Sequence, residues 1–289
     1  MNNQNLKLAI QKNGRLTKDT LSFLRKSGLE FESSQQKLFS SCRNLPLEIL
    51  YVRDNDITNY VQTGIVDLGI VGQNVINEKM PQVKKLLNLR FCFCSLVAAV
   101  LKESSISSIE QLNGLKIATS YPNSTKYFLA QNNLTATIVP IGGSVEITPT
   151  LGVANAIVDL TSTGSTLALN DLRPVAKLYD SEAVLIANNK SIQKTNKQQL
   201  INKLLLRFKG VLSAQKYKYV MMNAPENILP KIKKIIPGLK SPTVSPLAKS
   251  GWISVQSVVK EDIFWETIER LQQIGATGII VLPIEKMIN

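Results

Sequence analysis

Short apolar runs alternate with amphipathic stretches over residues 6–187. Residues 6–11 and 47–52 are predicted strands, and the leucines of residues 16–27 recur at the spacing of one helix face before Gly28. Strands that alternate with helices build βαβ units, in which a helix joins two parallel strands. The pattern therefore predicts an α/β fold with mainly parallel sheets.

The last part of the chain has a different order of elements. Its sequence predicts helices over residues 226–235 and 262–273 and strands over residues 217–222, 243–247, 252–259 and 278–282. The resulting order, βαββαβ, is that of a ferredoxin-like unit. We expect it to form a small separate domain.

Histidine is absent from all 289 residues, and this excludes several kinds of chemistry. A Ser-His-Asp relay, an imidazole general base and a His-ligated metal cannot be built. The three cysteines, Cys42, Cys92 and Cys94, contain no C-x-x-C pair. We expect Cys92 and Cys94 to be packing residues on one face of a strand over residues 91–101, with no metal site. So few cysteines favour a reduced, cytoplasmic protein.

The net charge of +13 raises the hypothesis of a nucleic-acid-binding protein. The 34 basic residues are scattered, however, and no helix-turn-helix, zinc-finger or RNP motif accompanies them. A dispersed excess of lysine is more typical of a solvated surface that also attracts polyanionic small molecules. We therefore expect no nucleic-acid partner. We also expect no membrane association and no secretory signal, since no apolar run approaches about 18 residues and the first residues have no basic region followed by an apolar one.

Residues 156–167 form the strongest candidate for a binding site. A predicted strand ends near Asp159, and residues with hydroxyl groups surround Gly164 before the next helix begins. Backbone N–H groups at such a turn, together with Ser and Thr hydroxyls, can hold a phosphate group. The alternative is an ordinary capping loop rich in Ser and Thr. The chain contains neither the P-loop nor the dinucleotide fingerprint, and spacing alone leaves both interpretations open.

The wider pattern of this segment is Glu146-x5-Gly152-x-Ala154-x2-Ile157-x-Asp159-Leu160-x2-Thr163-Gly164-x-Thr166-Leu167. It resembles the signature of the ATP phosphoribosyltransferases, the first enzymes of histidine biosynthesis. The other segments that fit this family are Gln11–Leu16, Arg53–Ile57, Val66–Gly72, Ala118–Asn123, Gly142–Glu146, Phe264–Thr267 and Val281–Met287. The resemblance covers nearly the whole chain, including the regulatory domain of the family's long form.

The resemblance implies a two-lobed catalytic body like that of periplasmic binding proteins, followed by a ferredoxin-like (ACT-like) regulatory domain. Lobe I would comprise residues 1–95 and 183–212, lobe II residues 96–182, and the regulatory domain residues 213–289. The implied reaction is transfer of the phosphoribosyl group of phosphoribosyl pyrophosphate to N1 of ATP, with release of pyrophosphate. Mg²⁺ would be the cofactor, held mainly by substrate phosphates rather than by protein ligands.

The resemblance also assigns site residues. Catalysis would involve Asp159, Glu146 and Arg15. Phosphoribosyl pyrophosphate would be bound by Asp159, Thr161, Ser162, Thr163, Gly164, Ser165 and Thr166. ATP would be bound by Lys12, Gly14, Arg15, Arg53, Asp67, Gly69, Gly72 and Tyr121, although a turn or packing role is an equal alternative for the last five. Histidine, as feedback inhibitor, would contact Asn223, Thr243 and Gly278, and dimers would exchange with hexamers.

The implied reaction agrees with the absence of histidine. Adenine N1 is unprotonated near neutral pH, so its attack requires no strong base. The protein would align the two substrates, neutralise the leaving group and stabilise a cation-like ribosyl centre. Three other classes stay open: a non-enzymatic solute-binding protein, an amino-acid-sensing regulator that has lost catalysis, and a nucleic-acid binder, which only the charge supports.

Overall fold

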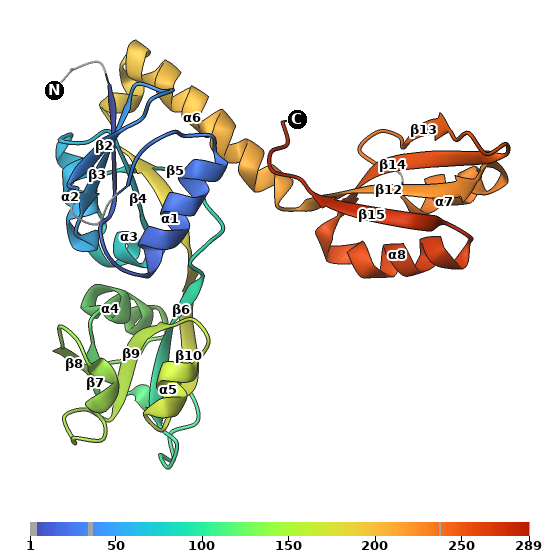
Figure 1. Cartoon of the computed structure of the whole chain (residues 1–289). Coiled ribbons are helices and arrows are strands. Elements are labelled where there is room, and N and C mark those ends of the chain that lie inside the picture. Colours follow the sequence, from blue (N-terminus) through green and yellow to red (C-terminus); the bar gives the residue numbers. More distant parts are fainter. Residues whose placement is uncertain (1–4, 34–36, 237, 289) are drawn as a thin grey trace. The chain divides into compact units, whose positions relative to one another are not determined.

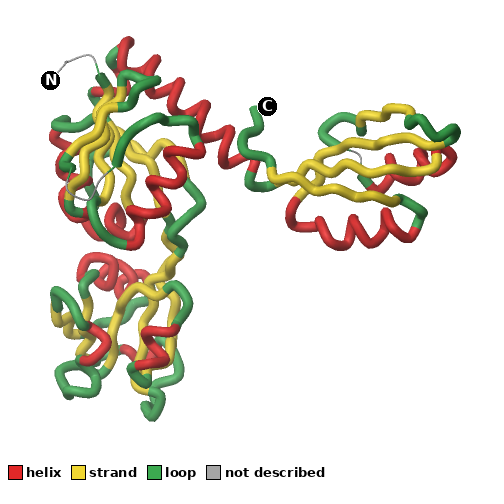
Figure 2. Tube along the Cα trace, viewed as in Figure 1, coloured by secondary structure: helices red, strands yellow, loops and turns green. Residues whose placement is uncertain are grey.

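The computed structural model describes residues 5–33, 37–236 and 238–288. The chain divides into two compact units, Met1–Ser22 with Leu29–Ile201, and Phe23–Gly28 with Asn202–Asn289. Figure 1 labels the elements, and Figure 2 shows that each unit is built on sheets accompanied by helices. Within the described residues, no helix is both long and apolar enough to cross a membrane.

The first sheet of the larger unit is built around the N-terminal strand. Its strand order is β2-β3-β1-β4-β11-β5. The strands are β1 (Leu6–Gln11), β2 (Phe39–Ser41), β3 (Leu47–Val52), β4 (Leu68–Gly72), β5 (Lys84–Asn88) and β11 (Ala183–Ala187). The helices that follow β1, β3 and β4 are α1 (Arg15–Lys26), α2 (Asp54–Thr63) and α3 (Gln73–Lys79). The apolar residues of β1 are fully buried, which places this strand at the centre of the core.

The second sheet of the larger unit has the order β10-β6-β9-β7-β8. Its strands are β6 (Cys94–Leu101), β7 (Lys116–Thr119), β8 (Thr137–Pro140), β9 (Ala156–Thr161) and β10 (Leu172–Ser181). The helices α4 (Pro122–Gln131) and α5 (Ser165–Leu169) follow β7 and β9, and a short 3-10 helix, η2 (Val145–Ile147), precedes β9. We call the part built on the first sheet lobe I and the part built on the second sheet lobe II.

The expectation of mainly parallel sheets was wrong, because both sheets are mixed. β1 is parallel to β3 and β4, and β7 is parallel to β8 and β9, but β6, β10 and β11 pair with their neighbours in the antiparallel direction. These three strands carry the chain out of one sheet and back into the other. β6 enters the second sheet from the first and runs antiparallel to β9, and β11 returns to the first sheet and runs antiparallel to β4.

The smaller unit has the predicted ferredoxin-like order. The strands β12 (Tyr217–Pro225), β13 (Thr243–Pro246), β14 (Trp252–Lys260) and β15 (Thr277–Pro283) form an antiparallel sheet with the order β13-β14-β12-β15. Helices α7 (Leu229–Ile235) and α8 (Phe264–Gln273) contribute Ile232 and Leu271 to a core that contains Val220, Met222 and Val255 of the sheet. The long helix α6 (Thr195–Ala214) precedes this sheet in the chain. The predicted fold class is confirmed.

Sequence periodicity missed β2, α3 and β5. β2 has three residues, too few to show an alternating pattern, and β5 begins with two exposed lysines, as edge strands often do. α3 is polar, and only Asn74 and Val75 are buried. The expected strand over residues 91–101 begins only at Cys94, because Cys92 has a left-handed backbone with φ of 53°. Cys92 and Cys94 therefore do not share a strand face, contrary to prediction.

A substitution at Gly69 in β4 would show how tightly β4 packs against α2 in lobe I. An added Cβ would lie 2.7 Å from Ile57 Cγ2 and 2.9 Å from Val61 Cγ2, both on the buried side of α2. Gly69→Ala is expected to destabilise the fold by about 1–3 kcal/mol through overpacking, measured as the free energy of unfolding in urea. Gly142→Ala is the control, because an added Cβ there meets nothing within 4 Å. Equal stability of the two variants would contradict this packing.

Candidate functional site

Three of the candidate ATP-binding residues stand at the carboxyl ends of neighbouring strands of the first sheet. Gln11 pairs with Val52, and Leu8 pairs with Leu68, so the parallel strands β3, β1 and β4 end at the same edge. Lys12, Arg53 and Gly72 stand at these ends, and the Lys12 N–H donates to the Val52 carbonyl at 2.8 Å. Open α/β sheets bind their ligands at this edge.

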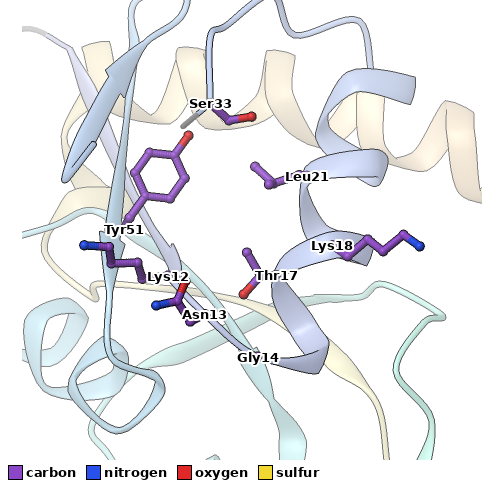
Figure 3. A pocket seen from close by; sticks show the side chains of 8 residues that line it. All are labelled: Lys12, Asn13, Gly14, Thr17, Lys18, Leu21, Ser33 and Tyr51. Carbon is purple, nitrogen blue, oxygen red and sulfur yellow. The ribbon is translucent and has the colours of Figure 1, made fainter. Parts of the chain in front are cut away.

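The turn between β1 and α1 borders a pocket of about 480 Å³. Figure 3 shows Gly14 at the turn, with Thr17 and Leu21 of α1 on one side and Lys12 and Tyr51 on the other. Gly14 has φ of 136°, and an added Cβ would lie 2.7 Å from the side-chain nitrogen Nε2 of Gln11. A glycine is therefore required for this turn.

Arg15 belongs to a second hollow, of about 430 Å³, which has walls from both lobes. We call this hollow the cleft. Five predicted site residues line it together: Arg15, Gly72, Tyr121, Thr161 and Ser162. Lobe I contributes Arg15 and Gly72, and lobe II contributes the other three. The structure thus brings one cation and several hydroxyl groups to one cavity between two sheets.

Asp159, Glu146 and Tyr121 interact electrostatically in lobe II. Burial raises the pKa of the Asp159 carboxyl, and the Glu146 carboxylate raises it further, while the hydrogen bond from the Leu160 N–H at 2.8 Å opposes the rise. Burial and the Asp159 carboxylate also raise the pKa of the Tyr121 phenol. Tyr121 therefore stays protonated and can donate a hydrogen bond at any ordinary pH.

The hydroxyl-rich loop turns sharply between β9 and α5. Gly164 has φ of +78° and donates its N–H to Thr161 Oγ1 at 3.0 Å, while the hydroxyls of Thr163 and Ser165 lie 2.9 Å apart. The side chains of Thr163, Ser165 and Thr166 are exposed. The loop therefore presents hydroxyl groups to solvent next to Thr161 and Ser162, which line the cleft.

Asp67 and Gly69 do not line the cleft or the neighbouring pocket. Asp67 precedes β4, at the opposite edge from Gly72, and is 2% exposed. Its carboxylate accepts hydrogen bonds from Lys197 Nζ and Ser191 Oγ, each at 2.6 Å, and from the Lys7 N–H at 3.0 Å. Gly69 packs against α2. These contacts favour the packing alternative for both residues.

Several residues that line the cleft were not among the predicted site residues. They are Gln11, Asp19, Asp54 and Asn74, together with Cys92 and Cys94. Burial raises the pKa of Asp54, and Lys79 opposes that rise. Asn74 lies in α3, whose polar sequence predicted no helix. Asp54 lies in the family-matching segment Arg53–Ile57, and the rule that ligands gather at the carboxyl ends of strands could have indicated Asn74.

The three candidate effector residues of the smaller unit are only partly together. In the antiparallel ladder Asn223 pairs with Thr277, and the Asn223 amide nitrogen lies 3.4 Å from an ideal Cβ on Gly278. Thr243 pairs with Gln256 on the other side of β14. Because neighbouring strands are about 4.8 Å apart, Thr243 lies two strands away from Asn223.

Comparison with known proteins identifies the family. The profile of the ATP phosphoribosyltransferases matches residues 53–210, and that of the HisG C-terminal domain matches residues 214–286. The chain belongs to the ATP phosphoribosyltransferase family. The resemblance inferred from the sequence is therefore confirmed, as are the enzyme class, a pentosyltransferase, and the place of its reaction at the start of histidine biosynthesis.

The relatives within this family are similar over almost their whole length. The ATP phosphoribosyltransferase of Cytophaga hutchinsonii is 44% identical over 284 residues, covering 98% of this chain and 99% of the relative. That of Bacteroides thetaiotaomicron is 43% identical over 283 residues, with the same coverage. Among solved structures, the ATP phosphoribosyl transferase (HisG:HisZ) complex from Thermotoga maritima matches with a TM-score of 0.60 and 27% identity, covering 71% of this chain and 96% of that one.

The structural role of Asp67 can be separated from ATP binding. Asp67→Asn removes the charge that pairs with Lys197, so we expect a loss of about 2–3 kcal/mol in the free energy of unfolding. At a temperature where the variant is folded, its KM for ATP should equal that of the wild type. A raised KM together with unchanged stability would instead show that Asp67 binds ATP.

The proximity of Glu146 to Asp159 predicts a pKa change. Glu146→Gln removes the negative charge that raises the Asp159 pKa, so the carboxyl should titrate at a lower pH than in the wild type. Burial is the larger cause and persists, so the pKa should stay above its ordinary value. Titration of the ¹³C-labelled carboxyl by NMR measures both effects. An unchanged titration midpoint would mean that the two carboxylates do not interact.

Proposed function

We propose that lobe II holds the phosphoribosyl half of phosphoribosyl pyrophosphate and lobe I the polyphosphate groups, so that N1 of ATP attacks the anomeric carbon in the cleft between them. The observation that carries this proposal is the composition of the cleft. Arg15 of lobe I faces a wall of lobe II that contains Tyr121, Thr161 and Ser162. A cation opposite hydroxyl donors suits a ligand that bears phosphates at both ends.

Lobe II would hold the phosphoribosyl half. The hydroxyls of Thr161, Ser162, Thr163, Ser165 and Thr166, with the backbone at Gly164, would donate to the 5-phosphate. Asp159 and Glu146 would accept from the ribose hydroxyls. Their negative charge also favours the positive charge that develops on the ribosyl ring as the bond to pyrophosphate breaks.

Lobe I would hold the polyphosphate groups. Lys12, Gly14 and Arg15 lie on the turn between β1 and α1, and Arg53 and Gly72 stand at the same sheet edge. Arg15 offers a planar pair of donors for phosphate oxygens. The net charge of +13 would add a favourable field for two polyanionic substrates.

The displacement needs placement more than proton transfer. The N1 lone pair forms the new bond to C1 of the ribose, and the pyrophosphate oxygen leaves with the electron pair of the old bond. The negative charge on pyrophosphate would be neutralised by Arg15 and by Mg²⁺. The tyrosine and threonine donors of the cleft are neutral and can orient oxygens without titrating.

The residues of the cleft fit Mg²⁺ held mainly by substrate oxygens. Among the described residues no cluster of three or more acidic or cysteine side chains could form a closed metal site. The carboxylates that line the cleft, Asp19 and Asp54, would suit an ion that binds one or two protein oxygens and otherwise phosphates and water. Bound Mg²⁺ would offset the charge of the leaving group.

The smaller unit would sense histidine. Asn223 and Gly278 lie together and would bind the effector, with Thr243 of the edge strand as the more distant contact. We propose catalytic lobes at residues 1–95 with 183–212 and at 96–182, a regulatory domain at 213–289, dimers that exchange with hexamers, and a cytoplasmic location. Sedimentation with and without histidine tests the assembly part of this proposal.

Release of pyrophosphate tests the reaction. With ATP, phosphoribosyl pyrophosphate and Mg²⁺ present, the full-length chain should release pyrophosphate continuously, and omission of either substrate should stop it. Binding of one substrate without any release in the complete mixture would favour a sensor or solute-binding protein and would refute the proposal.

Asp159→Asn tests the role of the carboxylate at the ribose. Loss of its charge should lower kcat at saturating substrates about 100-fold, because a charge placed at the reacting centre contributes mostly in the transition state. Asp171→Asn is the matched control, since Asp171 is exposed and pairs only with Lys102 among the ion pairs of the described residues. An unchanged kcat in Asp159→Asn would exclude a catalytic role.

A further inference from the structure

Helix α3 presents one polar face to lobe II. Asn74 and Glu78 are four residues apart and so project from the same side of the helix. Both side chains bond to groups of lobe II, although α3 itself belongs to lobe I. The helix therefore connects the lobes next to the cleft.

Glu78 caps the first turn of α4. Its two carboxylate oxygens accept the N–H groups of Asn123 and Ser124, each at 2.9 Å, and its carbonyl accepts Asn123 Nδ2 at 3.0 Å. The first N–H groups of a helix have no partner inside the helix, and a carboxylate there is favourable. The N-cap residue of α4 is Tyr121, whose side chain makes no capping hydrogen bond. The cap of α4 thus comes from the other lobe.

Asn74 fixes the hydroxyl group of Tyr121. The Asn74 Oδ1 accepts a hydrogen bond from the Ser181 hydroxyl at 3.1 Å, and the backbone N–H of Asn74 donates to Ser181 Oγ at 3.0 Å. The Asn74 Nδ2 donates to the Tyr121 hydroxyl at 3.3 Å. The Asn74 and Ser181 residues are both buried. With the Ser181 hydroxyl donating to Asn74 Oδ1, the Asn74 NH₂ group faces the Tyr121 hydroxyl.

The direction of these bonds determines what Tyr121 can do. A phenol that accepts a hydrogen bond from Asn74 keeps its own proton for another acceptor. Tyr121 lines the cleft, and its backbone is fixed by the N–H bond to Thr119 Oγ1 at 2.8 Å. The phenol proton is therefore available to an oxygen of a ligand in the cleft.

We propose that Asn74 and Glu78 are positioning residues: Glu78 fixes the α4 N-terminus against lobe I, and Asn74 orients the Tyr121 hydroxyl toward the substrates. This inference rests on the proposed function of the cleft. It assigns to α3 a role that neither its sequence pattern nor the family signature indicated. Asn74 acts on the reaction only through Tyr121.

A double-mutant cycle tests the role of Asn74. Asn74→Ala and Tyr121→Phe should each lower kcat/KM about tenfold, and the double variant should be no worse than Tyr121→Phe, because the same interaction is lost. Independent effects, which would multiply to about a hundredfold, would overturn the proposal, as would an unchanged kcat/KM in Asn74→Ala. Asn132→Ala, at the other end of α4, is the control and should behave as the wild type.

Glu78 is tested by a measurement that does not require activity. In Glu78→Ala, the amides of Asn123 and Ser124 should exchange hydrogen faster, and kcat/KM should fall by about tenfold with the protein folded. Glu78→Gln, which keeps one accepting oxygen, should restore part of both properties, and Glu103→Ala should change neither. Faster exchange with a wild-type kcat/KM would mean that Glu78 is only a structural cap and would overturn its positioning role. Unchanged exchange would mean that Glu78 does not cap α4. If the wild type releases no pyrophosphate, the proposed function fails while the exchange result still decides the cap.

Discussion

The two crossings between the lobes fix the geometry on which the cleft depends. The chain leaves lobe I after β5 and returns after β10, and only Glu182 separates β10 of the second sheet from β11 of the first. The Glu182 carboxylate accepts the Asn88 amide at 2.6 Å and the Arg90 N–H at 2.7 Å, and Leu89 and Ala183 are joined by a backbone hydrogen bond at 2.9 Å. The outgoing and returning segments are therefore bonded to each other. Two adjacent, mutually bonded segments hold the carboxyl edge of the first sheet opposite β9 and its loop.

A site with walls on two sheets suits a reaction between two charged substrates. Each lobe can bind its part of the substrates with its own strand ends and turns, so chemical specificity is built locally. The contacts of α3 with Tyr121 and the α4 N-terminus then set the position of one wall relative to the other. Positioned reactants need little acid–base assistance when the nucleophile is already unprotonated. The absence of histidine is consistent with this chemistry, since charge and alignment replace a proton relay.

The sequence predicted the elements whose side chains alternate or repeat regularly, together with the loop around Gly164. It also identified Arg15, Gly72 and Tyr121 as residues of the cleft. It could not predict α3, because a helix of seven residues with only Val75 and Ile76 packed against the core of lobe I shows too few apolar positions to reveal a helical period. It gave Asp67 the same weight as Gly72, since both belong to one motif. The pairing of β4 parallel to β1 shows that Gly72, and not Asp67, stands at the carboxyl edge of the sheet. The mixed sheets were missed for a related reason: periodicity identifies a strand but does not show which sheet it joins.

The most direct test of the account is the position of phosphoribosyl pyrophosphate in a crystal structure of its complex with the full-length chain. We expect the 5-phosphate to lie within hydrogen-bond distance of the loop from Thr161 to Thr166, with the ribose hydroxyls at Asp159 and the pyrophosphate toward Arg15. A 5-phosphate bound instead at the turn from Lys12 to Arg15, with the loop of lobe II empty, would contradict the assignment of the 5-phosphate to lobe II.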